Sequence, residues 1–153
     1  MKEELFTAAA ITSKEIFGNP KVFFRRFIKN YMKIWLSRHK KIELSLPNIE
    51  SPLDALNEYL GNLDKWGLQK SNEVKILSYE NNDNIKILQN GCPYSETCVM
   101  MIEYFGETPV CIRAIYYIEA IERRLGVNGI FDYRFQYSTH QCKIQIAKLQ
   151  ELY

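Results

Sequence analysis

The sequence predicts an α+β fold, in which an antiparallel four-stranded sheet made of two hairpins packs with helices in the order ααα-ββ-αα-ββ. Apolar residues recur at a helical spacing through the first third of the chain and again in residues 95–125. Between these parts and after them, short runs alternate apolar and polar residues, as half-buried strands do. This order of elements is typical of one antiparallel sheet covered by helices.

Three helices are expected before the first strand. Residues 2–17 form the first. An Asn-Pro pair at 19–20 then supplies an N-cap and a proline at the first helical position, where the missing N–H costs nothing. The second helix follows through the basic stretch 21–41, and a Ser-Pro pair at 51–52 opens the third, over 53–66.

Two hairpins are expected in the rest of the chain. Residues 72–79 and 84–90 are strand-like runs joined by residues 81–83, which have the composition of a turn. Residues 131–137 alternate aromatic and polar side chains, and a short connection leads to 142–146, whose apolar side chains share one face. Each pair therefore predicts one hairpin.

Two helices are expected between the hairpins. Residues 95–105 form a short one, for which Ser95 is the expected N-cap. A Thr-Pro pair at 108–109 opens the long helix, over 110–125, and Gly126 closes it.

Composition indicates one domain, covering residues 1–153, with an N-terminal helical pair over 1–48 and an α+β core over 49–153. The chain is 46% hydrophobic and 25% charged, and its length allows a core that needs neither a disulfide nor a metal. The net charge of +2 selects no class of partner. Because the sequence has no apolar run long enough to span a membrane, no export signal and only four cysteines, we expect a cytoplasmic protein with reduced thiols.

The segments TPVCIRAIYYIEAI (108–121) and STHQCKIQI (138–146) carry a resemblance. Together they resemble the second half of the 4-vinyl-reductase domain, a small-molecule-binding module. In the sensors of that family, cysteines and a glutamate form a zinc site beside an aromatic pocket. Cys111 and Cys142 stand at the matching first and last cysteine positions. The strand that carries the glutamate and another cysteine in the family offers only Asp132 here.

The segment GCPYSETC (91–98) carries a second resemblance, to relatives of L-2-amino-thiazoline-4-carboxylate hydrolase. This similarity implies a cysteine-dependent hydrolase that works through Cys92 or Cys98. Those proteins tend to carry an aspartate three residues after the cysteine of the long helix, and this chain has Ala114 there.

The cysteines leave several roles open. In the expected fold Cys92, Cys111 and Cys142 form one cluster, either as zinc ligands with Asp132 or His140 or as a metal-free thiol patch. The spacing of the cysteines does not match the close pairs of common structural zinc sites. Free cysteines are also often small buried residues.

Cys98 raises a different question, because it falls in the first turn of a helix, where the positive end of the helix favours a thiolate. A cysteine nucleophile needs a base, and the only histidines are His39 and His140. The alternatives are a partly buried cysteine beside a loop and a disulfide between Cys92 and Cys98.

The aromatic residues favour a pocket for a small apolar or aromatic molecule between the sheet and the long helix, although an ordinary aromatic core has the same composition. A binding domain without enzymatic activity is therefore our leading hypothesis. The residues expected to line the pocket are Trp66, Tyr116, Tyr117, Phe131, Tyr133 and Phe135.

The basic helix over 21–41 has the pattern of an amphipathic surface helix. A membrane or nucleic-acid surface is the alternative, but no nucleic-acid-binding signature accompanies the helix, and we expect no such partner. Relatives of the resembled fold often pair through their N-terminal helices. The aromatic residues within 22–36 therefore predict a homodimer.

Overall fold

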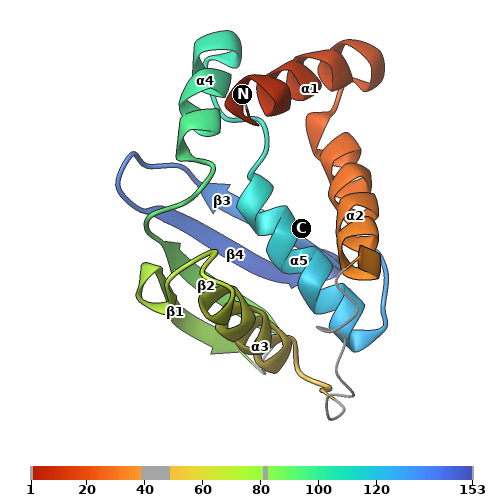
Figure 1. Ribbon diagram of the computed structural model, residues 1–153, viewed down its shortest axis with the longest axis vertical. Coiled ribbons are helices and arrows are strands. Elements are labelled where there is room, and N and C mark those ends of the chain that lie inside the picture. The colour runs from red at the N-terminus through yellow and green to blue at the C-terminus, as the bar shows by residue number, and fades with distance from the viewer. Residues whose placement is uncertain (1, 39–48, 81–82, 153) are drawn as a thin grey trace.

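The computed structural model describes residues 2–38, 49–80 and 83–152. It confirms the α+β class and the predicted order of helices and hairpins (Figure 1). The elements are α1 (Lys2–Phe17), α2 (Pro20–Arg38), α3 (Pro52–Lys65), the 3-10 turn η2 (Ser71–Glu73), β1 (Val74–Glu80), β2 (Asn84–Gln89), α4 (Ser95–Phe105), α5 (Ile112–Leu125), β3 (Phe131–Gln136), β4 (Cys142–Lys148) and α6 (Leu149–Leu152).

The four strands form one antiparallel sheet in the order β1-β2-β4-β3. The two hairpins therefore meet at the centre, where β2 pairs with β4 and Ile87 lies opposite Ile144. This pairing places the turn between β3 and β4 beside the end of β2, so the loop after β2 and the second hairpin share one end of the sheet.

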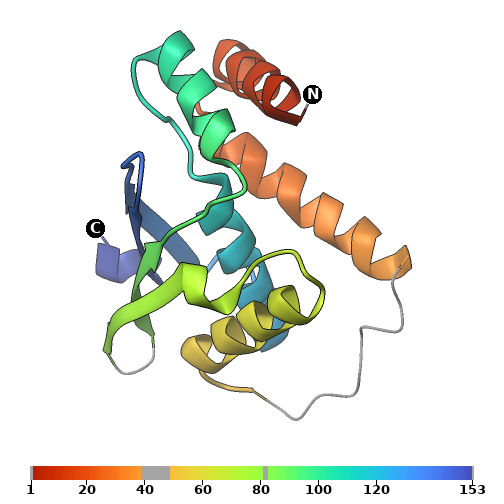
Figure 2. The same ribbon diagram turned by 60° about the vertical axis from the view of Figure 1, so that its left-hand side comes forward.

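The helices α3 and α5 cover one face of the sheet, and α2 packs on the outer side of α5 (Figures 1 and 2). The inward-facing isoleucines of β2 and β4 are buried beneath them. Phe24 and Ile28 of α2 belong to the same buried cluster, so the N-terminal helices contribute to the core of the sheet. At one end of the molecule α1 packs against α4.

A buried carboxylate joins α5 to its two neighbours. Glu122 is 3% exposed, and its Oε2 accepts hydrogen bonds from the backbone N–H groups of Ile130 (2.7 Å) and Phe131 (3.2 Å). Its Oε1 lies 3.3 Å from Nη2 of Arg25 on α2. These hydrogen bonds and the ion pair compensate the carboxylate for its loss of hydration. Through them Glu122 links β3 and α2 to the long helix.

Glu119 lies one turn earlier on α5, and its ion pair is longer than that of Glu122. Its Oε1 is 3.6 Å from Nη2 of Arg123. Burial raises the pKa of Glu119, because removing the carboxylate from water disfavours its charged form.

The N-caps of two helices differ from the sequence prediction, and one short helix was not predicted. Tyr94 is the N-cap of α4 and makes no side-chain capping bond, so Ser95 is the first helical residue and not the expected cap. The long helix begins at Ile112, and Sγ of Cys111 accepts a hydrogen bond from the N–H of Ala114 (3.5 Å) as its N-cap. The chain after β4 adds the short helix α6, for which the sequence analysis predicted nothing.

Some predictions concern residues that the structure does not describe. They are the last residues of the second helix (39–41), including His39, and most of the turn at 81–83. Among the described helices, none combines the length and apolar character that crossing a membrane requires.

Candidate functional site

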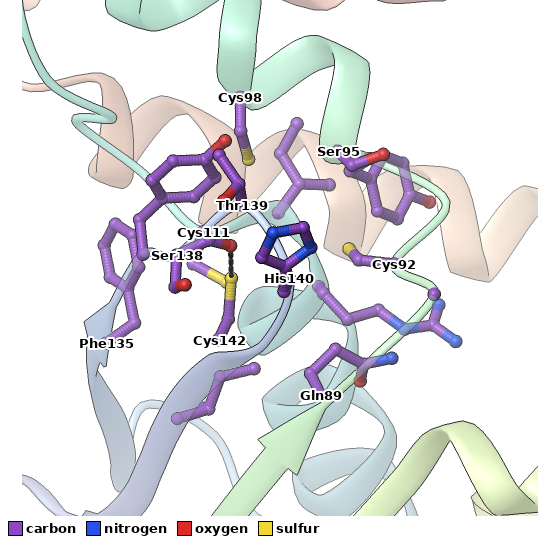
Figure 3. Close-up of a pocket in the computed structure, with 16 residues that line it drawn as sticks. Gln89, Cys92, Ser95, Cys98, Cys111, Phe135, Ser138, Thr139, His140 and Cys142 are labelled. Carbon is purple, nitrogen blue, oxygen red and sulfur yellow. Dashed lines mark hydrogen bonds between the residues drawn. The ribbon is translucent and has the colours of Figure 1, made fainter.

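A pocket of about 120 Å³ opens where the starts of α4 and α5 meet the turn between β3 and β4 (Figure 3). Its lining comes from three stretches of the chain, residues 89–98, 111–113 and 135–144. The sheet order brings these stretches together, because β2 and β4 are neighbours and α5 packs against β3 and β4.

The loop that enters the pocket depends on a glycine. Gly91 has φ of 53°, a conformation that side chains other than glycine rarely adopt, and a Cβ there would lie 2.8 Å from Cδ of Glu73. The N–H of Asn90 donates to the carbonyl of Glu73 (2.7 Å) and ties the same loop to η2. This tight turn directs Cys92 into the pocket wall.

All four cysteines line this pocket, and each comes from a different part of the fold. Cys92 lies in the loop after β2, Cys98 in α4, Cys111 at the cap of α5 and Cys142 at the start of β4. The sulfur atoms of Cys92 and Cys98 point toward the middle of the pocket, and Sγ of Cys142 donates to the carbonyl of Ser138 at 3.5 Å (Figure 3). None of the four is joined in a disulfide.

The structure thus brings together the three cysteines that the sequence analysis grouped, and it adds Cys98. The sequence analysis did not include Cys98 in this group. Its side chain reaches the pocket because the first turn of α4 is itself part of the wall.

Burial suppresses ionisation of two of these thiols. It raises the pKa of Cys98 to about 12, and it raises the pKa of Cys111 well above its usual range. The neighbouring thiols act in the same direction. For Cys98 the change is opposite to our expectation, because loss of hydration outweighs the favourable end of the helix.

The predicted zinc ligands are only partly together. His140 lines the pocket with the cysteines, whereas Asp132 does not. Oδ1 of Asp132 lies 2.6 Å from Nζ of Lys21 and 3.6 Å from Nη1 of Arg25, so ion pairs with α2 occupy this carboxylate. Within the described ranges, no three side chains of His, Cys, Asp or Glu are arranged to hold a metal ion. The zinc site stays a prediction.

Among the six aromatic residues expected to line a pocket, Phe135 lies in this pocket's wall. Two others support the wall from behind. The hydroxyl of Tyr133 accepts a hydrogen bond from the N–H of Cys111 (3.1 Å), and Tyr116 stacks on the wall residue Tyr94 with ring centroids 5.8 Å apart.

The other three expected aromatic residues are placed elsewhere. Tyr117, a residue of α5, is fully buried behind the wall residues Arg113 and Gln89, and Phe131 is buried where β3 begins. Trp66 lies against Trp35 of α2, with centroids 5.5 Å apart. The aromatic residues therefore divide between the general core and the pocket.

The sequence analysis overlooked Arg113. This residue is 5% exposed, lines the pocket and donates from Nε to the hydroxyl of Tyr117 (3.2 Å). The Tyr117 hydroxyl in turn donates to Oε1 of Gln89, another wall residue. A signal was available in the sequence, because Arg113 interrupts the apolar run at the start of the long helix.

Comparison with known proteins finds no matching family model, no similar curated protein and no similar solved structure. We therefore infer the function from the geometry of the pocket.

Proposed function

We propose that this chain is a small-molecule-binding domain, with the role of a sensor or carrier, and that it holds its ligand in the pocket at the start of α5. The observation that supports this proposal most is a concave site of about 120 Å³ that three separate stretches of the chain build together. Small-molecule sites have this form, with a mainly apolar wall and a few polar groups. The resemblance to 4-vinyl-reductase domains points in the same direction.

The size and wall of the pocket limit the ligand. An engineered protein cavity of about 150 Å³ binds benzene, so about 120 Å³ suits a molecule of one ring or less. Phe135, Ile112 and Ile144 supply apolar surface, and Tyr94 and Tyr137 add aromatic rings. A small apolar or aromatic molecule fits this wall, at one end of the long helix.

A blocking variant tests the proposal with phenol as the probe. Ser138 is an exposed wall residue, so Ser138→Trp fills the pocket from its rim without disturbing the core. Gln136→Trp is the matched control, because Gln136 is exposed at the end of β3, two residues before Ser138, and lies outside the wall. At about 100 times the Kd, phenol raises the Tm of the wild type by roughly 5–10 °C. Only Ser138→Trp removes this shift, and an equal shift in both variants would contradict the proposal.

A cysteine-dependent hydrolase is the second candidate, and one observation favours it. His140, which could act as a base, lies in the same pocket as Cys92. This candidate requires one thiol that reacts fast with iodoacetamide at neutral pH. Slow and equal labelling of all four cysteines would remove it.

We further propose that the domain forms a homodimer through α1 and α2. Phe27, Tyr31 and Ile34 are exposed and lie along one stripe of α2, where a second copy would cover them. Native mass spectrometry at micromolar concentration tests this pairing. Ile34→Glu dissociates the dimer and Lys33→Glu, beside the stripe, does not; a wild type that is strictly monomeric would refute the proposal.

A further inference from the structure

The buried guanidinium of Arg113 lacks a counter-charge in the part of the chain that the structure describes. Its side chain makes no ion pair with any described carboxylate, and Nη2 is buried without a hydrogen-bond partner. Nε reaches only the neutral hydroxyl of Tyr117. Burying a charge without a partner is costly, so a group that completes this site would bind strongly.

The rest of the wall also favours negative charge. Its 16 residues include Arg113 and His140 but no aspartate or glutamate. Hydroxyl groups of Ser95, Thr139 and Tyr137 are present as hydrogen-bond donors. An anion entering the pocket would meet donors and a cation without any acidic side chain to repel it.

Two helices begin at this pocket. The first residues of α4 (Ser95) and of α5 (Ile112 and Arg113) all belong to the wall. The positive ends of both helix dipoles therefore act on the same space. The N-cap residue of α4, Tyr94, makes no side-chain capping hydrogen bond, and the acidic residue of the first turn, Glu96, lies outside the pocket wall.

From these three features we propose that the ligand of this pocket is a small organic acid, whose carboxylate pairs with Arg113 while its apolar part lies against Phe135 and Ile144. The planar guanidinium matches the two oxygens of a carboxylate. The volume of about 120 Å³ leaves room for a tail of one ring at most. This inference rests on the proposed function, because it names the class of ligand for the same pocket.

Benzoate and benzamide form the test pair, since they have nearly the same shape and differ in charge. Calorimetric titration of the wild-type protein at pH 7 and low salt should show benzoate binding at least about 30-fold more tightly than benzamide. Arg113→Met removes this preference, so that benzoate and benzamide bind the variant with similar affinity. Arg123→Met is the control and keeps the preference, because Arg123 lies on the same helix outside the pocket.

The possible results separate the two proposals. If benzoate and benzamide bind equally and Ser138→Trp blocks both, the proposal of an organic acid is overturned. The proposal that this pocket binds a small molecule is then still supported. If neither compound binds, and acetate and isobutyrate also fail, both proposals are overturned.

A second measurement avoids reliance on the folding of Arg113→Met. In ¹⁵N NMR spectra of the wild type, benzoate should shift the Nε–H resonance of Arg113 and the backbone amides at the start of α5. Benzamide should leave the Nε–H resonance in place. An unmoved Arg113 resonance at saturating benzoate would overturn the inference.

Discussion

The reactivity of the pocket thiols gives a quantitative prediction. Iodoacetamide at pH 7 should alkylate Cys98 about 30-fold more slowly than a cysteine in an unfolded peptide. The reagent reacts with the thiolate, so the rate depends on how much thiolate the pocket permits. Burial within the pocket raises the pKa of Cys98 from 9.0 to about 12.

The expected factor follows from two opposing effects of that pKa change. A rise of about three units lowers the thiolate fraction at neutral pH about 1000-fold. A more basic thiolate is also a better nucleophile, with a Brønsted coefficient of about 0.4–0.5, which recovers about 30-fold. The net slowing is therefore about 30-fold. Because the Cys98 side chain is partly buried, limited access of the reagent to its sulfur would slow the reaction further.

Peptide mass spectrometry can follow all four cysteines in one experiment. The protein is treated with iodoacetamide for increasing times, quenched and digested, and the alkylated fraction of each cysteine is compared with that of the urea-unfolded chain. Cys111 should also be slow, because it is buried and burial raises its pKa. In urea the four rates should become similar.

One result would refute this reasoning. If folded Cys98 reacts as fast as it does in urea, burial does not control its ionisation, and the pocket stabilises a thiolate. Such a result would also revive Cys98 as a nucleophile and favour the hydrolase.

Three further predictions concern stability. The free energy of unfolding should fall between pH 9 and pH 12, because Cys98 ionises near pH 9 in the unfolded chain and only near pH 12 in the fold. The stability that the buried neutral thiol contributes is complete below pH 9. Above pH 9 it is lost by at most about 1.4 kcal/mol per pH unit. Urea titrations at pH 8 and pH 10 should show a smaller loss for Cys98→Ala than for the wild type; equal losses would argue against this cause. Glu122→Gln should cost about 2–4 kcal/mol in urea unfolding because two backbone N–H groups lose a charged acceptor, whereas Glu119→Gln at pH 7 should change stability by less than about 1 kcal/mol. Comparable losses in the two variants would contradict the role given to Glu122. Tyr133→Phe should cost about 1–2 kcal/mol in thermal unfolding, because a buried N–H at the cap of α5 loses its acceptor, and Tyr137→Phe, which removes no such bond, should serve as the neutral control.

Local signals in the sequence predicted most of the fold. The Asn-Pro pair at 19–20 and the Ser-Pro pair at 51–52 mark the starts of α2 and α3 as the structure has them, and Ser51 caps α3. The alternation in 84–90 and 131–137 predicted β2 and β3 to within a residue or so. These signals work because capping and strand alternation depend on neighbours in the chain.

The start of α5 shows where local reasoning ends. A Thr-Pro pair at 108–109 predicted a helix from residue 110, but the helix begins at Ile112. The hydroxyl of Tyr133 holds the N–H of Cys111, which thereby stays outside the helix as its cap. Tyr133 belongs to a strand that follows much later, so no local pattern could report this contact.

The residues of the pocket also differ in whether the sequence could predict their place. Sequence spacing and family resemblance were enough to group Cys92, Cys111 and Cys142. They were not enough to include Cys98 or Arg113, whose places in the wall depend on how α4 and α5 pack against the second hairpin.

By itself the sequence determined which segments are helices and hairpins, because those choices are made between residues close along the chain. Only the tertiary structure decided that β2 and β4 pair at the centre of the sheet and that two helix starts open onto one pocket. It also decided that Arg113 is buried with no described carboxylate paired to it and that burial raises the pKa of Cys98. The physical reason is that the groups that surround a buried side chain are distant from it in sequence. The free energy of a charged or ionisable side chain depends on which of these groups take the place of its hydrating water.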